Sequence, residues 1–150
     1  MNKTILFLVI LTGISAQLPA NMIGLLINKS ITFNREEATK SILIYGDEDD
    51  AKLMNSMVKG ELVSIDDFEG TQEYVNLIFV GISDGDIENA KKKCGKVLSI
   101  SNSDENSDVV ALSFGLLDNK RPKILVNLAI AKKEADFKSA FLKIAKIKDD

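Results

Sequence analysis

The stretch NLIFVGI, residues 76–82, decides the fold of this chain. It is almost continuously apolar, contains β-branched residues, and is followed directly by Ser83, a turn-forming residue. A strand of this kind has no polar face to turn toward water, which is typical of a parallel strand at the centre of a sheet. The stretch therefore predicts a parallel sheet that is covered by helices on both faces.

Further strands are predicted on both sides of this stretch. Upstream lie residues 41–46 (SILIYG) and 61–65 (ELVSI), and downstream lie residues 96–101 (KVLSIS). Each is a short apolar run bounded by turn residues. Residues 109–117 and 123–127 (KILVN) flank a turn-rich link and predict a hairpin near the end of the chain.

Three helices are predicted, one before these strands and two between them. Residues 20–29 (ANMIGLLINK) have the apolar content of a short, largely buried helix. Residues 50–58 follow an acidic run and stop before Gly60, and a third helix begins at a Ser83 cap and continues to about Lys93. Alternation of these helices with strands indicates one α/β domain.

A closing helix is predicted over residues 128–147. Phe137, Phe141 and Ile144 follow one another at spacings of four and three, so we expect them to form an apolar stripe against the sheet. The whole chain then predicts one three-layer α/β domain of the Rossmann-like or flavodoxin-like kind. It has a mixed, mostly parallel sheet, helices on both faces, and a C-terminal hairpin plus helix.

The first 16 residues have the pattern of a secretory signal peptide. Lys3 gives a positive start, residues 5–11 (ILFLVIL) form an apolar core, and mainly small residues precede Gln17. An uncleaved membrane anchor is the alternative, but a span needs about 20 apolar residues and this stretch is shorter. We expect cleavage before Gln17 or Ala16, which leaves residues 17–150 as a single periplasmic or extracellular domain.

Composition removes several classes of function. The chain has 19 basic and 22 acidic residues and no histidine, so neither a serine-histidine-aspartate triad nor a histidine-based metal site can form. No glycine-rich phosphate loop is present, and the lysines are interleaved with acids rather than gathered into a nucleic-acid-binding face. We therefore expect no enzyme, no cofactor and no nucleic-acid partner. Cys94 is either a somewhat activated thiol near lysines or a small buried residue.

Six residues are candidates for contact with a partner or ligand: Phe33, Asp47, Glu48, Asp49, Ser83 and Asp84. The acids from Asp47 onward follow a predicted strand, where open α/β sheets place their ligands, and could hold a divalent cation. The alternative is an ordinary acidic first turn of a helix. Asp84 is interpreted mainly as part of a helix cap, and Phe33, placed between the first helix and the first strand, as a partner anchor or a core residue.

Several of these segments resemble the YfiR family of periplasmic regulators. The strand ending ILIYGD (residues 42–47), the strand LIFVGIS (77–83) and the strand VLSISN (97–102) match family motifs. The most specific match is the end of the chain, where ILVNLAIA (124–131) and FKSAFLKIA (137–145) resemble the closing segment of the family. Phe33 stands in the place of a family tryptophan.

The resemblance implies a non-enzymatic exported domain that binds a membrane protein and changes its activity. The implied partner is an inner-membrane signalling protein of the diguanylate cyclase or sensor kinase type. The sequence does not decide whether the chain also forms a homodimer. The competing interpretation is a module that binds a small solute at the carboxyl edge of the sheet, for which the acidic run after residue 46 is the only indication.

Overall fold

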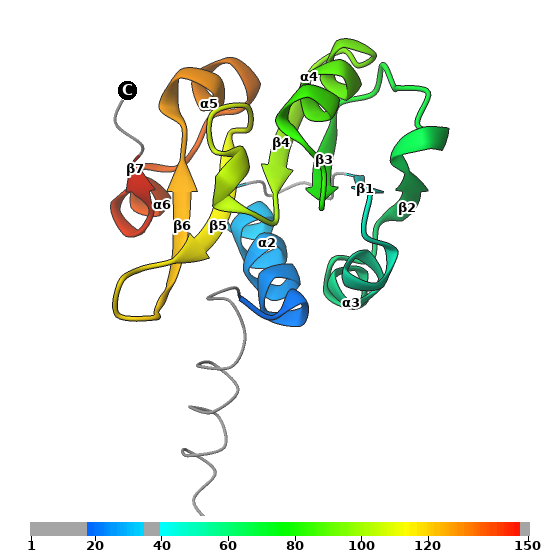
Figure 1. Cartoon of the computed structure of the whole chain (residues 1–150). Coiled ribbons are helices and arrows are strands. Elements are labelled where there is room, and N and C mark those ends of the chain that lie inside the picture. Colours follow the sequence, from blue (N-terminus) through cyan, green and yellow to red (C-terminus); the bar gives the residue numbers. More distant parts are fainter. Residues whose placement is uncertain (1–17, 35–39, 148–150) are drawn as a thin grey trace, which may run out of the picture.

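A seven-stranded sheet forms the centre of the computed structural model, which describes residues 18–34 and 40–147. The predicted signal peptide lies outside these residues. The strands are β1 (Ser41–Tyr45), β2 (Glu61–Ser64), β3 (Val75–Val80), β4 (Val97–Ser101), β5 (Leu112–Leu116), β6 (Pro122–Val126) and β7 (Lys146–Ile147). Their order across the sheet is β2-β1-β3-β4-β5-β6-β7 (Figure 1).

Strand β3 is the predicted central strand. All six of its residues are buried, and it pairs in parallel with β1 on one side and β4 on the other. β2 and β5 extend the parallel part, whereas β6 returns antiparallel to β5 as the predicted hairpin. The prediction of a mixed, mostly parallel sheet is confirmed, and the order of its first five strands is that of flavodoxin-like folds.

Helices cover both faces of the sheet, as predicted. They are α2 (Ala20–Asn34), α3 (Glu48–Val58), α4 (Asp84–Lys92), α5 (Leu128–Glu134) and α6 (Ser139–Ile144), with short 3-10 turns η1 (Ile65–Asp67) and η2 (Asp104–Asn106). The apolar side chains of α2, α3, α5 and α6 belong to one hydrophobic core and those of α4 to the other, and the ion pair of Lys91 and Glu134 joins α5 to α4 (Figure 1). Among the described helices, none is long and apolar enough to cross a membrane.

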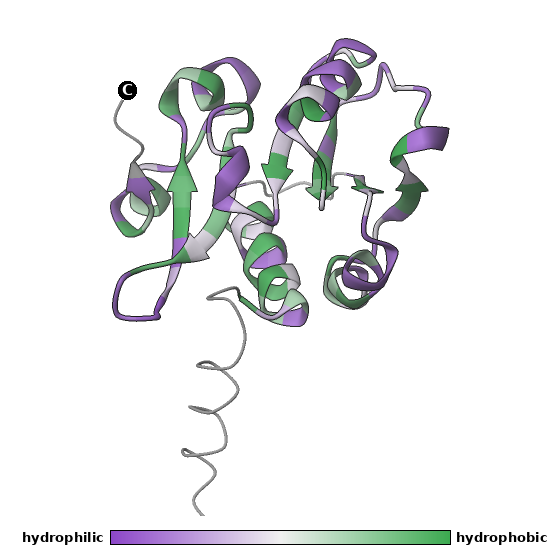
Figure 2. Cartoon of the chain, in the orientation of Figure 1, coloured by the Kyte–Doolittle hydropathy of each residue, from purple (hydrophilic) through white to green (hydrophobic). Residues whose placement is uncertain are grey.

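Two hydrophobic cores result, one on each side of the sheet. Leu43, Ile78 and Leu98 point to the side of α2 and α3, while Leu77 and Phe79 point to the side of α4. This alternation follows from the two-residue period of a strand. Figure 2 shows hydrophobic colour along α2 and β6 and hydrophilic colour in the hairpin turn, as burial of the sheet requires.

The prediction of one closing helix over residues 128–147 is wrong. α5 ends at Glu134, a second helix begins at Ser139, and the chain then adds β7 to the edge of the sheet beside β6. Two contacts interrupt the helix: the Tyr74 hydroxyl donates to the carbonyl of Glu134, and the backbone nitrogen of Lys138 donates to Oδ1 of Asn34. Tertiary partners thus replace the hydrogen bonds that a continuous helix would have made.

The predicted apolar stripe of this segment is only partly correct. Phe141 is 1% exposed in the core, but Ile144 is 71% exposed because α6 ends there and turns its last residue to water. Phe137 stacks on Phe141 with ring centroids 5.6 Å apart. Phe33 also lies near Phe141, at 6.1 Å, and belongs to the last turn of α2 rather than to a linker as predicted.

Replacement of Phe141 by alanine should destabilise the domain by about 3 to 5 kcal/mol, because it leaves a cavity between α6 and the sheet. Ile144→Ala removes a side chain that is already in water and should change the free energy of unfolding by less than about 0.5 kcal/mol. Urea denaturation of the two purified variants measures both values. Equal losses of stability would contradict the structure of the C-terminal segment.

Candidate functional site

Five of the six predicted contact residues meet at one edge of the sheet. Asp47, Glu48 and Asp49 follow the carboxyl end of β1, and Ser83 and Asp84 follow that of β3. The two strands are parallel neighbours, and the connections from them leave the sheet in different directions, so a crevice is expected between them. Phe33 is not part of this group, since it lies in the last turn of α2 against Phe141.

The loops after β1 and β3 touch each other through two glycines. Gly46 donates its backbone nitrogen to the carbonyl of Val80, at 2.9 Å. A Cβ atom on Gly46 would come within 2.6 Å of the carbonyl oxygen of Gly81, and Gly81 itself has a φ of +67°. Only glycine permits the close contact at position 46 and the left-handed conformation at position 81 without strain.

Asp47 and Ser83 have equivalent roles in these two loops. Oδ1 of Asp47 accepts a hydrogen bond from the backbone nitrogen of Asp50 at 3.2 Å, and Oγ of Ser83 accepts one from that of Asp86 at 3.3 Å. Each residue is therefore the N-cap of the helix that follows it. The interpretation of the acidic run as the first turn of a helix is supported, and α3 begins two residues earlier than predicted.

Asn102, at the end of β4, joins the next loop to this edge, and the sequence analysis did not single it out. Its Oδ1 accepts a hydrogen bond from the backbone nitrogen of Gly81 at 3.2 Å. Its own backbone nitrogen donates to the carbonyl of Phe79 at 3.1 Å. An asparagine directly after an apolar strand is the signal in the sequence that could have identified it.

Asn106 in η2 makes a second connection between the same loops. Its side-chain nitrogen donates to the carbonyl of Ile82 at 3.1 Å and to Oδ1 of Asp84 at 2.7 Å. Its side-chain oxygen accepts a hydrogen bond from Ser101 at 2.6 Å. Asn106 is buried and all of its side-chain polar atoms have partners, so it fixes the loop after β4 against the loop after β3.

Two adjoining hollows open along this edge, and together we call them the carboxyl-edge groove. One, of about 540 Å³, lies between the start of α2, η2 and the turn after β5. The other, of about 580 Å³, lies between η2 and the start of α4. Both are lined by Asn102, Ser103 and Glu105, and the buried side chains of Ile23 and Phe114 give the first hollow an apolar floor.

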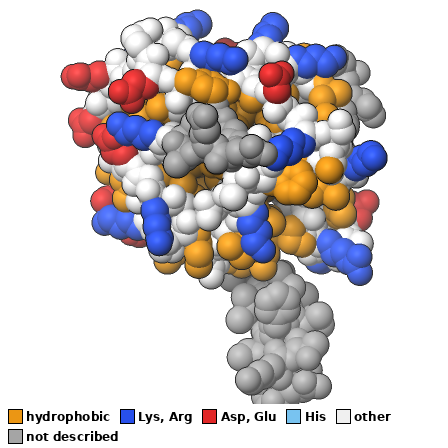
Figure 3. Space-filling view, turned by 180° about the vertical axis from the view of Figure 1, so that it is seen from behind, with side chains coloured by type: hydrophobic (Ala, Val, Ile, Leu, Met, Phe, Trp, Pro, Cys, Tyr) orange, Lys and Arg blue, Asp and Glu red, His pale blue; other side chains and the backbone are white. Residues whose placement is uncertain are grey.

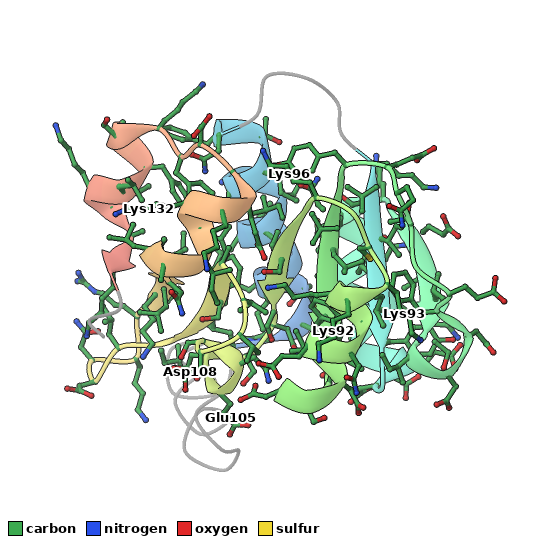
Figure 4. All side chains as sticks on the ribbon, turned by 90° about the horizontal axis from the view of Figure 1, so that it is seen from above. Lys92, Lys93, Lys96, Glu105, Asp108 and Lys132 are labelled. Carbon is green, nitrogen blue, oxygen red and sulfur yellow. The ribbon has the colours of Figure 1, made fainter. Side chains whose placement is uncertain are left out.

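The groove is acidic. The first hollow is lined by four carboxylates and one lysine: Asp50, Asp104, Glu105, Asp118 and Lys120. Asp104 pairs with Lys123 at 3.0 Å. Figure 4 places Glu105 and Asp108 on one side of the molecule and Lys96 on the opposite side, and Figure 3, the view from behind, shows lysine and arginine side chains with several acidic side chains among them. Within the first hollow, the carboxylates outnumber the cations.

Asp50 lines the groove and has a raised pKa. Its side chain is partly buried, and burial together with the nearby charges of Asp47 and Asp49 raises the pKa of its carboxyl group. Within residues 18–34 and 40–147, however, no group of three or more acidic or cysteine side chains could hold a metal ion. The acids of the edge favour positive charge in general without forming a coordination site.

Glu134 is a buried charged residue that sequence reasoning missed. Its Oε2 accepts hydrogen bonds from the backbone nitrogen and hydroxyl of Ser99, at 2.8 and 2.7 Å, and its Oε1 pairs with Lys91 at 2.7 Å. Lys91 also donates to the carbonyl of Val109. The carboxylate has full partners, so it fastens α5 to α4 and β4.

Cys94 follows the end of α4 and is partly buried. Burial raises the pKa of its thiol, which outweighs the lowering by Lys93 and by a hydrogen bond from the backbone at Thr71. The sulfur lies 3.4 Å from the carbonyl oxygen of Ala90 and acts as a hydrogen-bond donor to it. The thiolate is disfavoured, which supports the interpretation of Cys94 as a small packed residue rather than an activated one.

Comparison with known proteins adds no relative. No model of a known protein family matches the chain, and a search of curated proteins returns no match. The resemblance to the YfiR family therefore stays a proposal.

Asp50→Asn should stabilise the domain at neutral pH. A carboxyl group whose pKa is raised by folding opposes folding when it is ionised, so its removal relieves this cost above the raised pKa. This gain in stability should shrink as the pH falls. It should vanish below the ordinary pKa of an aspartate, where Asp50 is protonated in both the folded and the unfolded wild type. Thermal denaturation across this pH range measures it, with Glu88→Gln on exposed α4 as the control. An Asn variant less stable than wild type at neutral pH would refute the assignment.

Proposed function

We propose that this chain is an exported, non-enzymatic recognition domain that regulates a membrane-bound signalling protein by direct contact. The observation that carries the proposal is the carboxyl-edge groove, a concave surface with an acidic rim and an apolar floor. The predicted leader supports export, and the resemblance of the strand and closing motifs to YfiR-type regulators supports the choice of partner.

The polar side chains at the groove are consistent with binding rather than with chemistry. Nucleophilic catalysis needs a nucleophile next to a base that activates it. Here Ser83 caps a helix, and Asn102 and Asn106 tie loops together. Ser103 is likewise a cap, since its hydroxyl accepts from the backbone nitrogen of Glu105. These residues build a stable surface and are already engaged within the fold.

The charge and apolar floor of the groove indicate which kind of partner segment would bind there. Glu105 and Asp118 are exposed on its rim, and Phe114 lies on its floor. A segment with lysine or arginine beside apolar side chains complements both features, because the acidic rim attracts its charge and the floor accepts its apolar atoms. We therefore infer that a basic, partly apolar segment of the signalling protein enters the groove.

A small-solute-binding module is the second candidate, and the size of the groove favours it. Each hollow, of about 540 and 580 Å³, is within the range of small-molecule pockets. The same acidic rim would select an organic cation. The two candidates share a site and differ in whether its occupant is part of a protein.

Site-specific photo-crosslinking in the source cells separates them. A photoreactive amino acid at Asp118, on the rim, should give an adduct with an inner-membrane signalling protein, identified by mass spectrometry. The same amino acid at Glu88 on α4 should not give this adduct. Glu105→Lys, which reverses a rim charge, should reduce the yield of the Asp118 adduct severalfold.

Other outcomes decide against the proposal. Adducts of equal yield from Asp118 and Glu88 would mean that the groove has no special role. If the rim gives no protein adduct while putrescine raises the melting temperature of the wild type and leaves Glu105→Lys unchanged, the solute-binding function replaces the regulatory one.

A further inference from the structure

Four large apolar side chains are exposed on the outer surfaces of α2 and α3. They are Met22, Leu25, Leu53 and Met57, and the most exposed, Leu53, is 54% accessible. Surface residues of this size are ordinary when they are scattered, but a group of them marks an interaction surface. We call these four side chains the α2–α3 patch.

The four side chains lie together because α2 and α3 cross at close range. A Cβ atom on Gly24 would come within 2.7 Å of the carbonyl oxygen of Met54, so the two backbones nearly touch there. Leu25 and Leu53 are the sequence neighbours of these two contact residues and lie on the outer side of the crossing. Met22 and Met57 are three and four residues away from them, on the same helical faces.

The two helices start at the same edge of the sheet and run in the same general direction. α2 starts beside the carboxyl-edge groove, which Leu18 and Ala20 help to line, and α3 starts directly after the carboxyl end of β1. Both therefore run toward the opposite edge of the sheet. This direction fixes which charged residues border the patch at each end.

Two exposed charges of opposite sign border the patch at diagonal corners. Asp49 lies four residues before Leu53, toward the carboxyl edge on α3. Lys29 lies four residues after Leu25, toward the other edge on α2. Neither takes part in an ion pair within the described parts of the chain.

We propose that the α2–α3 patch is the interface of a homodimer with two-fold symmetry. A two-fold axis that lies in the plane of the patch, perpendicular to the line from Asp49 to Lys29, turns one patch to face the other and exchanges these diagonal corners. It brings Asp49 of each protomer to Lys29 of its partner, twice, and places the apolar side chains of one patch on those of the other. This is the self-complementarity that an isologous interface requires.

The charges favour a second copy over a lipid surface as the occupant. An anionic membrane attracts clustered lysines and repels acids, whereas this patch carries one of each sign at opposite ends. The interface is also separate from the proposed regulatory contact, because none of its four apolar residues lines the carboxyl-edge groove.

Charge exchange tests the proposal. Sedimentation velocity of the mature chain over a concentration series should show a monomer–dimer equilibrium. Asp49→Lys and Lys29→Asp each place like charges together at both ends of the interface, and each should weaken the dimer by about tenfold or more. The double variant reverses both partners, so it should recover most of the lost affinity. Circular dichroism confirms that each variant is folded.

Ile144→Asp is the matched control, because Ile144 is also exposed and apolar but lies outside the patch. It should dimerise as the wild type does, whereas Leu53→Asp should be monomeric. A wild-type chain that stays monomeric at every concentration would overturn the proposal. The proposal would also be overturned if Leu53→Asp still dimerised, or if the double variant formed a dimer no tighter than those of the single variants.

Discussion

Strand β3 cannot present either of its faces to water, and this constraint organises the molecule. Its six residues are all buried, and it has a parallel partner on each side. Parallel neighbours need crossover connections, and buried faces need cover, so the helices are divided between the two sides of the sheet. α2 and α3 take one side and α4 the other, which places the change of direction between β1 and β3.

The carboxyl-edge groove lies at the carboxyl edge of the sheet, beside the loops that follow β3, β4 and β5. The loops that leave β1 and β3 diverge, and Gly46 and Gly81 allow their backbones to approach closely at the point of divergence. Asn102 and Asn106 then hold the loop after β4 against them. These polar side chains hold the loops in place, and the surface that they build is acidic and concave. These properties suit recognition of a positively charged partner.

The fold could be predicted where the signal is local in sequence. An apolar run predicted β3, and the cap at Ser83 predicted the start of α4, whereas α3 begins two residues before the predicted start at Asp50. The roles of Glu134 and Asn106 could not be predicted, because each bonds to residues that are distant along the chain. These residues come close only once the strands have their order in the sheet. The break after α5 was missed for the same reason: Tyr74 and Asn34, both distant in sequence, supply the contacts that end the helix.

Two surfaces stay exposed once the core is formed: the groove, which we propose as the contact for a partner, and the α2–α3 patch, which we propose as the contact for a second copy. Because none of the apolar residues of the patch lines the groove, we expect the two surfaces to act independently. Hydrogen–deuterium exchange of the mature chain, measured by mass spectrometry at low and high protein concentration, tests this independence most directly. Exchange in peptides from α2 and α3 should slow at high concentration, while exchange in η2 and the turn after β5 should not change. Slower exchange in the groove loops, or no change in α2 and α3, would contradict the account.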